Sequence, residues 1–77
     1  MIININETIL KLINKDEKLR DILYDLGFKE ITKPGMLQTV GRFMTLKAGS
    51  NLRKIDLKMI VKRLEEEGYQ VKGEKNE

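Results

Sequence analysis

The sequence predicts an all-α fold: a small orthogonal array of four to five short helices whose chain ends are suited to a minimal two-stranded pairing. The main evidence is apolar residues at the spacing i, i+3, i+4, i+7, which marks one face of an amphipathic helix. This spacing occurs over residues 19–26 and again over residues 57–64. Helix start and end signals flank both segments, and 77 residues are enough for only one domain.

The first residues favour an extended segment followed by a helix. Ile3 and Ile5 lie on one side of a β-prone start. Asn6 is the predicted N-cap, because its side chain can accept a hydrogen bond from the first turn. We therefore expect the first helix over residues 7–14.

The second helix carries the clearest signals. Asp16 is a suitable cap, and the apolar spacing then continues to Leu26. Gly27 fits the position just after a helix, where a left-handed conformation costs glycine little, and Phe28 is placed to pack back on the helix end. These signals predict a helix over residues 16–26.

The third helix is expected to begin at Pro34, since proline suits the first helical position. Gly41 lies within this segment, where it would let another helix approach closely. The segment carries a broad apolar face, which consists of Met36, Leu37, Val40, Phe43 and Met44.

Two further helices are expected after this face. Thr45 is a cap for a short helix that ends near residue 51, and Gly49 makes that helix weak, with a 3₁₀ turn or a loop as the alternative. Asp56 caps the last helix, which ends at Gly68.

The chain ends are expected to meet. The extended residues 69–71 can pair with residues 3–5 as a minimal ribbon. We expect a single domain over residues 1–72 and a disordered tail over residues 73–77. The predicted core consists of Leu19, Ile22, Leu23, Leu26, Phe28, Val40, Leu57, Ile60, Val61 and Leu64.

The composition argues against catalysis. The chain has no Cys and no His, so disulfides, ordinary zinc or iron–sulfur ligands and the usual acid–base catalyst at neutral pH are missing. We therefore expect no enzyme activity, no metal and no cofactor. There is no signal peptide pattern and no long apolar run, so we expect a cytoplasmic protein that does not bind membranes.

Two candidate sites follow from the third helix. Its apolar face, Met36, Leu37, Val40, Phe43 and Met44, is a candidate interaction face, and the alternative is that these residues belong to the core. The start of the helix is a candidate anion site formed by Lys33, Gly35 and Arg42, and the alternative is that Pro34 and Gly35 only start the helix.

The charge is unevenly distributed. Residues 29–63 carry a net charge of +7, whereas residues 1–28 carry −1 and residues 64–77 carry −3. A basic middle segment can attract an anionic partner such as nucleic acid, or the acidic ends of a second copy, or it can be an ordinary solvated surface. Nucleic acid is the less expected partner, because the few aromatic residues do not form a stacking motif.

The order of several short motifs resembles a known family. The Leu26-Gly27-Phe28 helix end, a six-residue loop closed by Pro34, the cap Thr45 and the Ile55-Asp56 start of the last helix are similar to the small helical domain of unknown function 1858. The resemblance covers residues 5–68. It implies the helical fold, a bacterial cytosolic setting and an accessory role, since related domains also occur at the N-terminus of iron–sulfur-cluster repair and hemerythrin-like proteins.

The chain departs from many members of this family in the loop before Pro34. Those members carry a Cys-x-x-Cys pair there, whereas this chain has Glu30 and Lys33 at the two positions. A Glu and a Lys can form an exposed ion pair worth about 0–1 kcal/mol, but they cannot exchange a disulfide. Redox or cluster chemistry is therefore not expected here.

Two functional hypotheses result. The first is a noncatalytic protein-interaction or regulatory module that self-associates or docks on a protein partner through the face at residues 36–44. The second is that the basic surface of residues 29–63 binds nucleic acid or another polyanion.

Overall fold

The computed structural model describes residues 1–73 and confirms five helices with a minimal strand pair. The helices are α1 (Ile9–Lys15), α2 (Lys18–Leu26), α3 (Pro34–Thr39), α4 (Leu46–Arg53) and α5 (Leu57–Glu66), and a 3₁₀ turn, η1 (Val40–Arg42), continues α3. Two strands, β1 (Ile2–Asn4) and β2 (Gln70–Lys72), stand at the chain ends. The disordered tail expected over residues 73–77 lies almost wholly outside the described residues.

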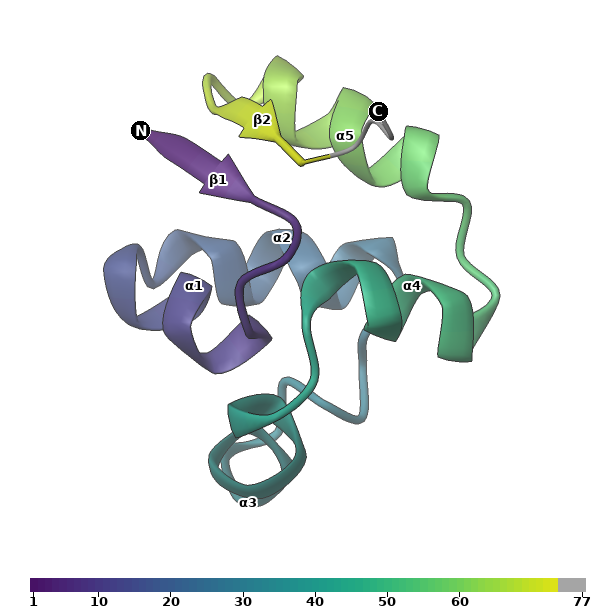
Figure 1. The fold of residues 1–77 in the computed structure, drawn as a ribbon. Helices are drawn as coiled ribbons and strands as arrows, with labels where there is room; N and C mark the ends of the chain where they lie inside the picture. The colour runs from purple at the N-terminus through teal and green to yellow at the C-terminus, as the bar shows by residue number, and fades with distance from the viewer. Residues whose placement is uncertain (74–77) are drawn as a thin grey trace.

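The helices form three levels (Figure 1). α5 and the strands lie at the top, α1, α2 and α4 lie below them, and α3 lies at the bottom. α2 runs across this view while α3 is seen end-on, so the two helices cross steeply, as expected for an orthogonal array. The long Phe28–Lys33 connection gives the chain the room to make this turn.

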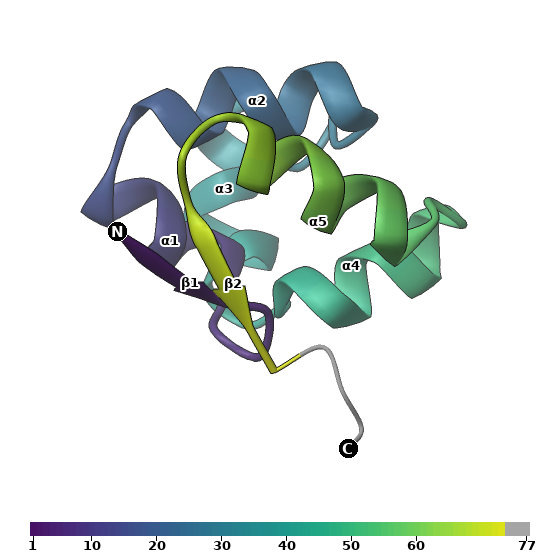
Figure 2. The ribbon, with the colours of Figure 1, turned by 90° about the horizontal axis from the view of Figure 1, so that it is seen from above.

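The two chain ends meet as a parallel pair (Figure 2). Ile2 lies opposite Gln70, and Ile3 lies opposite Val71. Ile3 is fully buried, because the strand alternates and directs this side chain toward the helices. The expected pairing of the ends is thus present, and it closes the fold over the core.

The predicted C-terminal end of α2 and the predicted start of α5 are confirmed. Gly27 has a φ of 122°, and the Phe28 N–H donates to the Leu23 carbonyl at 2.9 Å, the bond that closes a Schellman ending. The Asp56 carboxylate accepts from the Lys58 N–H at 2.9 Å. Before α2, Asp16 Oδ1 accepts from the Lys18 N–H at 3.0 Å, but the helix begins at Lys18, two residues later than predicted, and Glu17 holds the N-cap position.

The predicted cap of the first helix was wrong. Thr8, not Asn6, caps α1: its Oγ1 accepts from the Lys11 N–H at 3.2 Å. The Asn6 N–H instead donates to Asn4 Oδ1 at 2.8 Å, so this asparagine belongs to a turn. α1 therefore begins two residues later than predicted, directly after Thr8, which forms an antiparallel bridge with Thr45.

α4 is longer and more regular than expected. Thr45 caps it as predicted, but the helix continues to Arg53, with no break at Gly49. Gly49 is buried, and a β-carbon there would lie 3.0 Å from Phe28 Cε1 and 3.2 Å from Ile9 Cδ1. The glycine therefore marks close packing of α4 on the core and does not mark a weak helix.

Most of the predicted core is buried. Leu26, Val40 and Leu57 are half-buried and pack against the core, while the other predicted core residues are buried. The prediction missed a large part of the core, most of it from the N-terminal third: Ile3, Ile5, Ile9, Leu12, Ile13, Ile31, Leu37, Leu46 and Tyr69.

Candidate functional site

The loop before α3 is held by its own backbone and by one buried hydroxyl. Thr32 Oγ1 donates to the Phe28 carbonyl at 2.9 Å. Glu30 and Lys33 form an ion pair across 3.4 Å, and both side chains are mostly exposed. This is the weak surface pair expected for the two positions.

The predicted interaction face is divided by the fold. Leu37 is buried in the core, and Val40 and Met44 are half-buried against it. The two remaining residues reach solvent: Met36 is 39% exposed and Phe43 is 80% exposed. Leu37 therefore cannot contact a partner, and the usable part of the face is smaller than the sequence indicated.

Leu52 of α4 adds to this surface, although it is not among the candidate site residues that the sequence predicts. It is 65% exposed, although it is a large apolar residue. We expected the helix to end near residue 51, so Leu52 was not placed on any helix face. Its position in the last turn of α4 is a consequence of the unbroken helix through Gly49.

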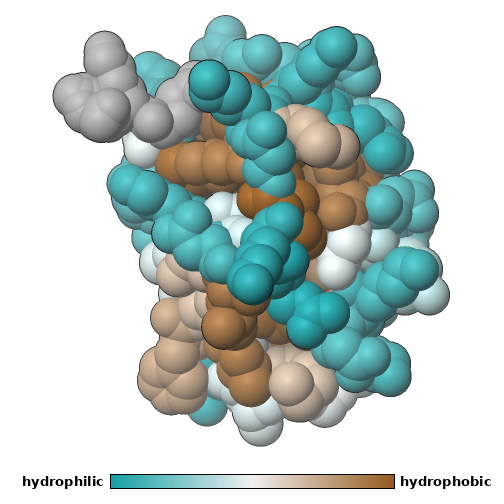
Figure 3. Space-filling model, turned by 90° about the vertical axis from the view of Figure 1, so that its right-hand side faces the viewer, coloured by the Kyte–Doolittle hydropathy of each residue, from teal (hydrophilic) through white to brown (hydrophobic). Residues whose placement is uncertain are grey.

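Met36 and Leu52 line a recess between α3 and α4. Figure 3 shows brown and tan apolar atoms reaching the lower edge of this face. The recess encloses about 80 Å³. We call it the apolar recess; its lining residues are Phe28, Glu30, Ile31, Met36, Val40, Met44, Leu52 and Arg53. The two charged members, Glu30 and Arg53, are exposed, so polar groups flank an apolar interior.

The residues of the predicted anion site lie on two consecutive elements. Lys33 and Gly35 stand at the start of α3, whereas Arg42 ends the 3₁₀ turn that follows it. The Lys33 ammonium is already paired with Glu30, and α3 has only six residues. Arg42 lines a depression on α1, whereas Lys33 and Gly35 line neither that depression nor the apolar recess.

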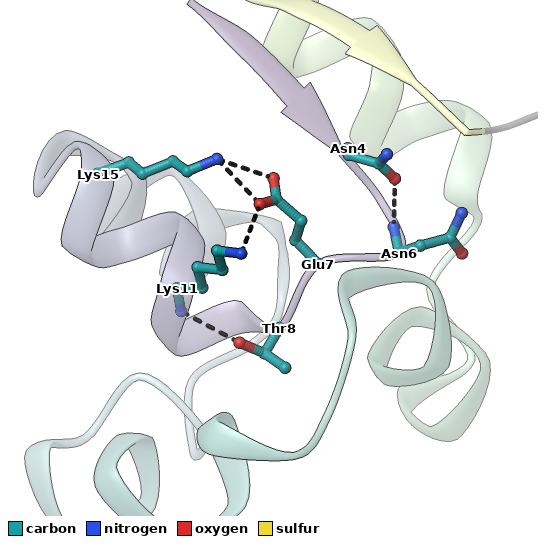
Figure 4. A network of polar contacts seen from close by, with 6 residues as sticks. All are labelled: Asn4, Asn6, Glu7, Thr8, Lys11 and Lys15. Carbon is teal, nitrogen blue, oxygen red and sulfur yellow. Dashed lines mark hydrogen bonds and ion pairs between the residues drawn. The ribbon is translucent and has the colours of Figure 1, made fainter.

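Arg42 instead joins a shallow depression on α1. This depression encloses about 380 Å³ and is lined by Thr8, Leu10, Lys11, Asn14, Lys15 and Arg42. Beside it the Glu7 carboxylate binds the Lys15 ammonium at 2.9 Å and the Lys11 ammonium at 3.5 Å (Figure 4). The hydrogen bond from Lys15 is the main reason that the pKa of Glu7 lies below its usual value.

Neither a metal site nor a spanning helix is found in the described part of the chain. Within residues 1–73, no three carboxylates gather where they could hold a metal ion. Over the same residues, every helix is too short or too polar to cross a lipid bilayer.

Comparisons with known proteins agree with the fold. The family model described as a domain of unknown function (DUF1858) matches residues 3–61. The crystal structure of a conserved domain protein from Streptococcus pneumoniae TIGR4 is similar, with a TM-score of 0.91 and 38% sequence identity over 96% of this chain and 94% of that chain. No curated protein matches. The helix ends and caps that suggested this family are thus supported by both matches, and the chain belongs to the DUF1858 family.

Proposed function

We propose that this domain is a noncatalytic, cytoplasmic interaction module that binds a protein partner through the apolar recess. The observation that carries the proposal is the exposure of Met36 and Leu52, two large apolar residues that line this recess. Phe43, which precedes Met44 in the chain, is a further exposed apolar residue. Large apolar side chains that gather on one face of a small domain mark interaction sites. The absence of cysteine suits a reducing compartment.

The recess suits an apolar side chain of a partner. Phe28, Ile31 and Val40 supply a fixed floor, since they pack in or against the core. Met36 and Met44 are unbranched and can adapt to a partner of irregular shape. Glu30 and Arg53 would then lie at the rim, where charged residues orient a partner more than they add affinity.

The experiment replaces exposed members of the recess and leaves the core intact. Leu52→Asp and Met36→Asp add a charge to the recess, whereas Met59→Asp adds the same charge to another exposed apolar position, on α5, which is 60% exposed. Met44 is unsuitable, because its sulfur lies 3.3 Å from the β-carbon position of Gly49 and a charge there would disturb packing.

The readouts separate self-association from a different partner. Sedimentation of the purified chain tests the first, and capture from a bacterial lysate, followed by rebinding of the purified captured protein, tests the second. We expect Leu52→Asp and Met36→Asp to abolish the association and Met59→Asp to keep it. Equal behaviour of all three variants would refute the recess as the binding surface.

A further inference from the structure

The depression on α1 is a second concave feature, separate from the apolar recess. It exists because η1 packs closely on α1. A β-carbon at Gly41 would lie 2.9 Å from Leu37 Cδ1 and 3.7 Å from the Leu10 backbone nitrogen. Gly41 is buried at this contact, and Arg42 beside it lines the depression together with Lys11 and Lys15.

The lining is strongly basic. Lys11, Lys15 and Arg42 line the depression, and no carboxylate does. Lys11 and Lys15 are four residues apart, so they project from the same side of α1. Figure 4 shows both ammonium groups turned toward Glu7, which is the single carboxylate paired with them among the described residues. The cations thus exceed the carboxylate by two charges.

Arg42 is the free cation of this group. It is exposed, and it forms no ion pair with any carboxylate of residues 1–73. Its guanidinium carbon lies 5.6 Å from the centre of the Phe43 ring, which limits where the guanidinium can point. A planar guanidinium with several N–H donors suits two oxygens of one anion.

Neutral groups complete the lining. Asn14 is exposed and carries an amide that can donate. Thr8 Oγ1 already accepts from the Lys11 N–H, so its own proton is left for another acceptor. Leu10 adds an apolar part. The depression is shallow and open to solvent, so a ligand bound there would stay partly exposed.

We propose that this depression binds a small phosphorylated molecule, with its phosphate held by Arg42 and Lys11 and its remaining atoms against Leu10. A phosphate dianion matches the excess of two positive charges better than a single carboxylate does. The proposal is independent of protein binding at the apolar recess, since the two lining sets share no residue.

Glu7 has an opposite role in this proposal. Its carboxylate draws the ammonium groups of Lys11 and Lys15 to itself and competes with an incoming anion. Glu7→Gln removes this negative charge with little change of shape. It should therefore tighten phosphate binding, whereas loss of a lining cation should weaken it.

The test uses inorganic phosphate and pyrophosphate as probes and follows the backbone amide signals of the chain by NMR at constant ionic strength. We expect saturable shifts centred on Lys11, Asn14 and Arg42. Arg42→Gln should raise the dissociation constant about three- to fivefold, and Glu7→Gln should lower it by about the same factor. Arg20→Gln, the matched control, makes the same charge change at an exposed position of α2 and should alter it less than about twofold.

Several results would overturn the proposal. One is equal weakening by Arg20→Gln and Arg42→Gln, because it would show a response to net charge only. Another is the absence of saturable shifts in the α1 and η1 amides. A DNA duplex, titrated at the same concentration of phosphate groups, should not bind more tightly than pyrophosphate. Tighter binding of DNA, with shifts of the α4 and α5 amides, would mean that the basic surface binds nucleic acid and not a small phosphorylated molecule.

Discussion

Tyr69 donates its phenol hydroxyl to Asp16 Oδ2 at 2.7 Å, across 53 positions of the chain. The other oxygen of this carboxylate accepts from the Lys18 N–H at the start of α2. The Lys18 ammonium also lies 5.9 Å from the centre of the Tyr69 ring. The residue that precedes β2 is thereby tied to the junction of α1 and α2, which locks the C-terminal end of the fold onto its N-terminal half.

This contact predicts a loss of stability at high pH. Burial, and then the hydrogen bond and charge of Asp16, raise the pKa of Tyr69 to about 12, from an ordinary value near 10. Since the folded pKa is raised, its contribution is fully present below about pH 10 and is lost as the pH rises toward about 12. The free energy of unfolding, measured with urea across this range, should fall in the natural chain.

Tyr69→Phe is the control for this prediction. It removes the hydroxyl but keeps the ring, which is 7% exposed in the fold. We expect Tyr69→Phe to lower the free energy of unfolding by about 1–2 kcal/mol at neutral pH. The free energy of unfolding should then fall less steeply as the pH rises from about 10 to about 12. The same hydrogen bond is the main reason that the pKa of Asp16 is lowered, so the acid limb below about pH 4 should also become shallower. An unchanged alkaline limb would mean that Tyr69 is not the group responsible.

Local signals were the part of the fold that the sequence predicted well. Gly27, Thr45 and Asp56 act where expected, because a cap depends on a few neighbouring residues. Asn6 failed as a cap because a distant contact, the bridge between Thr8 and Thr45, decides where α1 begins. No local pattern reports such a contact.

The candidate surface was harder to predict for the same reason. Periodicity places Leu37 and Met36 on one apolar face, but only packing decides that Leu37 is buried and Met36 reaches solvent. Leu52 stands in the last turn of α4, which runs unbroken through Gly49, where the helix packs closely on Phe28 and Ile9. The sequence predicts Gly49 to be a weakness of its helix, whereas in the fold it permits close contact between α4 and the core.

Lys54 offers a stabilising substitution. It is the one non-glycine residue with a positive φ in the described chain, at 57°, and it ends α4 in the left-handed conformation. A side chain disfavours this conformation, and glycine does not. Lys54→Gly should therefore raise the free energy of unfolding by about 0.5–1 kcal/mol in urea denaturation.

Lys62 provides the matched control. It is an exposed lysine within α5, where the backbone is helical. Lys62→Gly should lower the stability by about 0.5–1 kcal/mol, because glycine disfavours a helix interior. If both substitutions destabilise, the left-handed strain at Lys54 is not relieved by glycine.

Nucleic-acid binding can be tested directly. Two of the basic residues in 29–63 are occupied: Arg63 pairs with Glu67 at 3.0 Å and lies 3.6 Å from Asp25, and Lys33 pairs with Glu30. We therefore expect a DNA duplex to bind more weakly than about 10⁻⁴ M at low ionic strength, measured by fluorescence anisotropy. Tighter binding that falls steeply with added salt would favour the polyanion hypothesis over the interaction module.

Gly35 and Gly49 should respond in opposite ways to the same substitution. No atom lies within 4 Å of a β-carbon built at Gly35, so Gly35→Ala should stabilise α3 by about 0.5–1 kcal/mol through helix propensity. At Gly49 the β-carbon would meet Phe28, Ile9 and the Met44 sulfur at 3.0–3.3 Å. Overpacking costs about 1–3 kcal/mol, which exceeds the gain in propensity, so Gly49→Ala should lower the urea midpoint. A rise in the midpoint for Gly49→Ala would show that α4 can move away from Phe28 at little cost. Since Phe28 and α4 both line the apolar recess, the shape of the recess would then be adjustable.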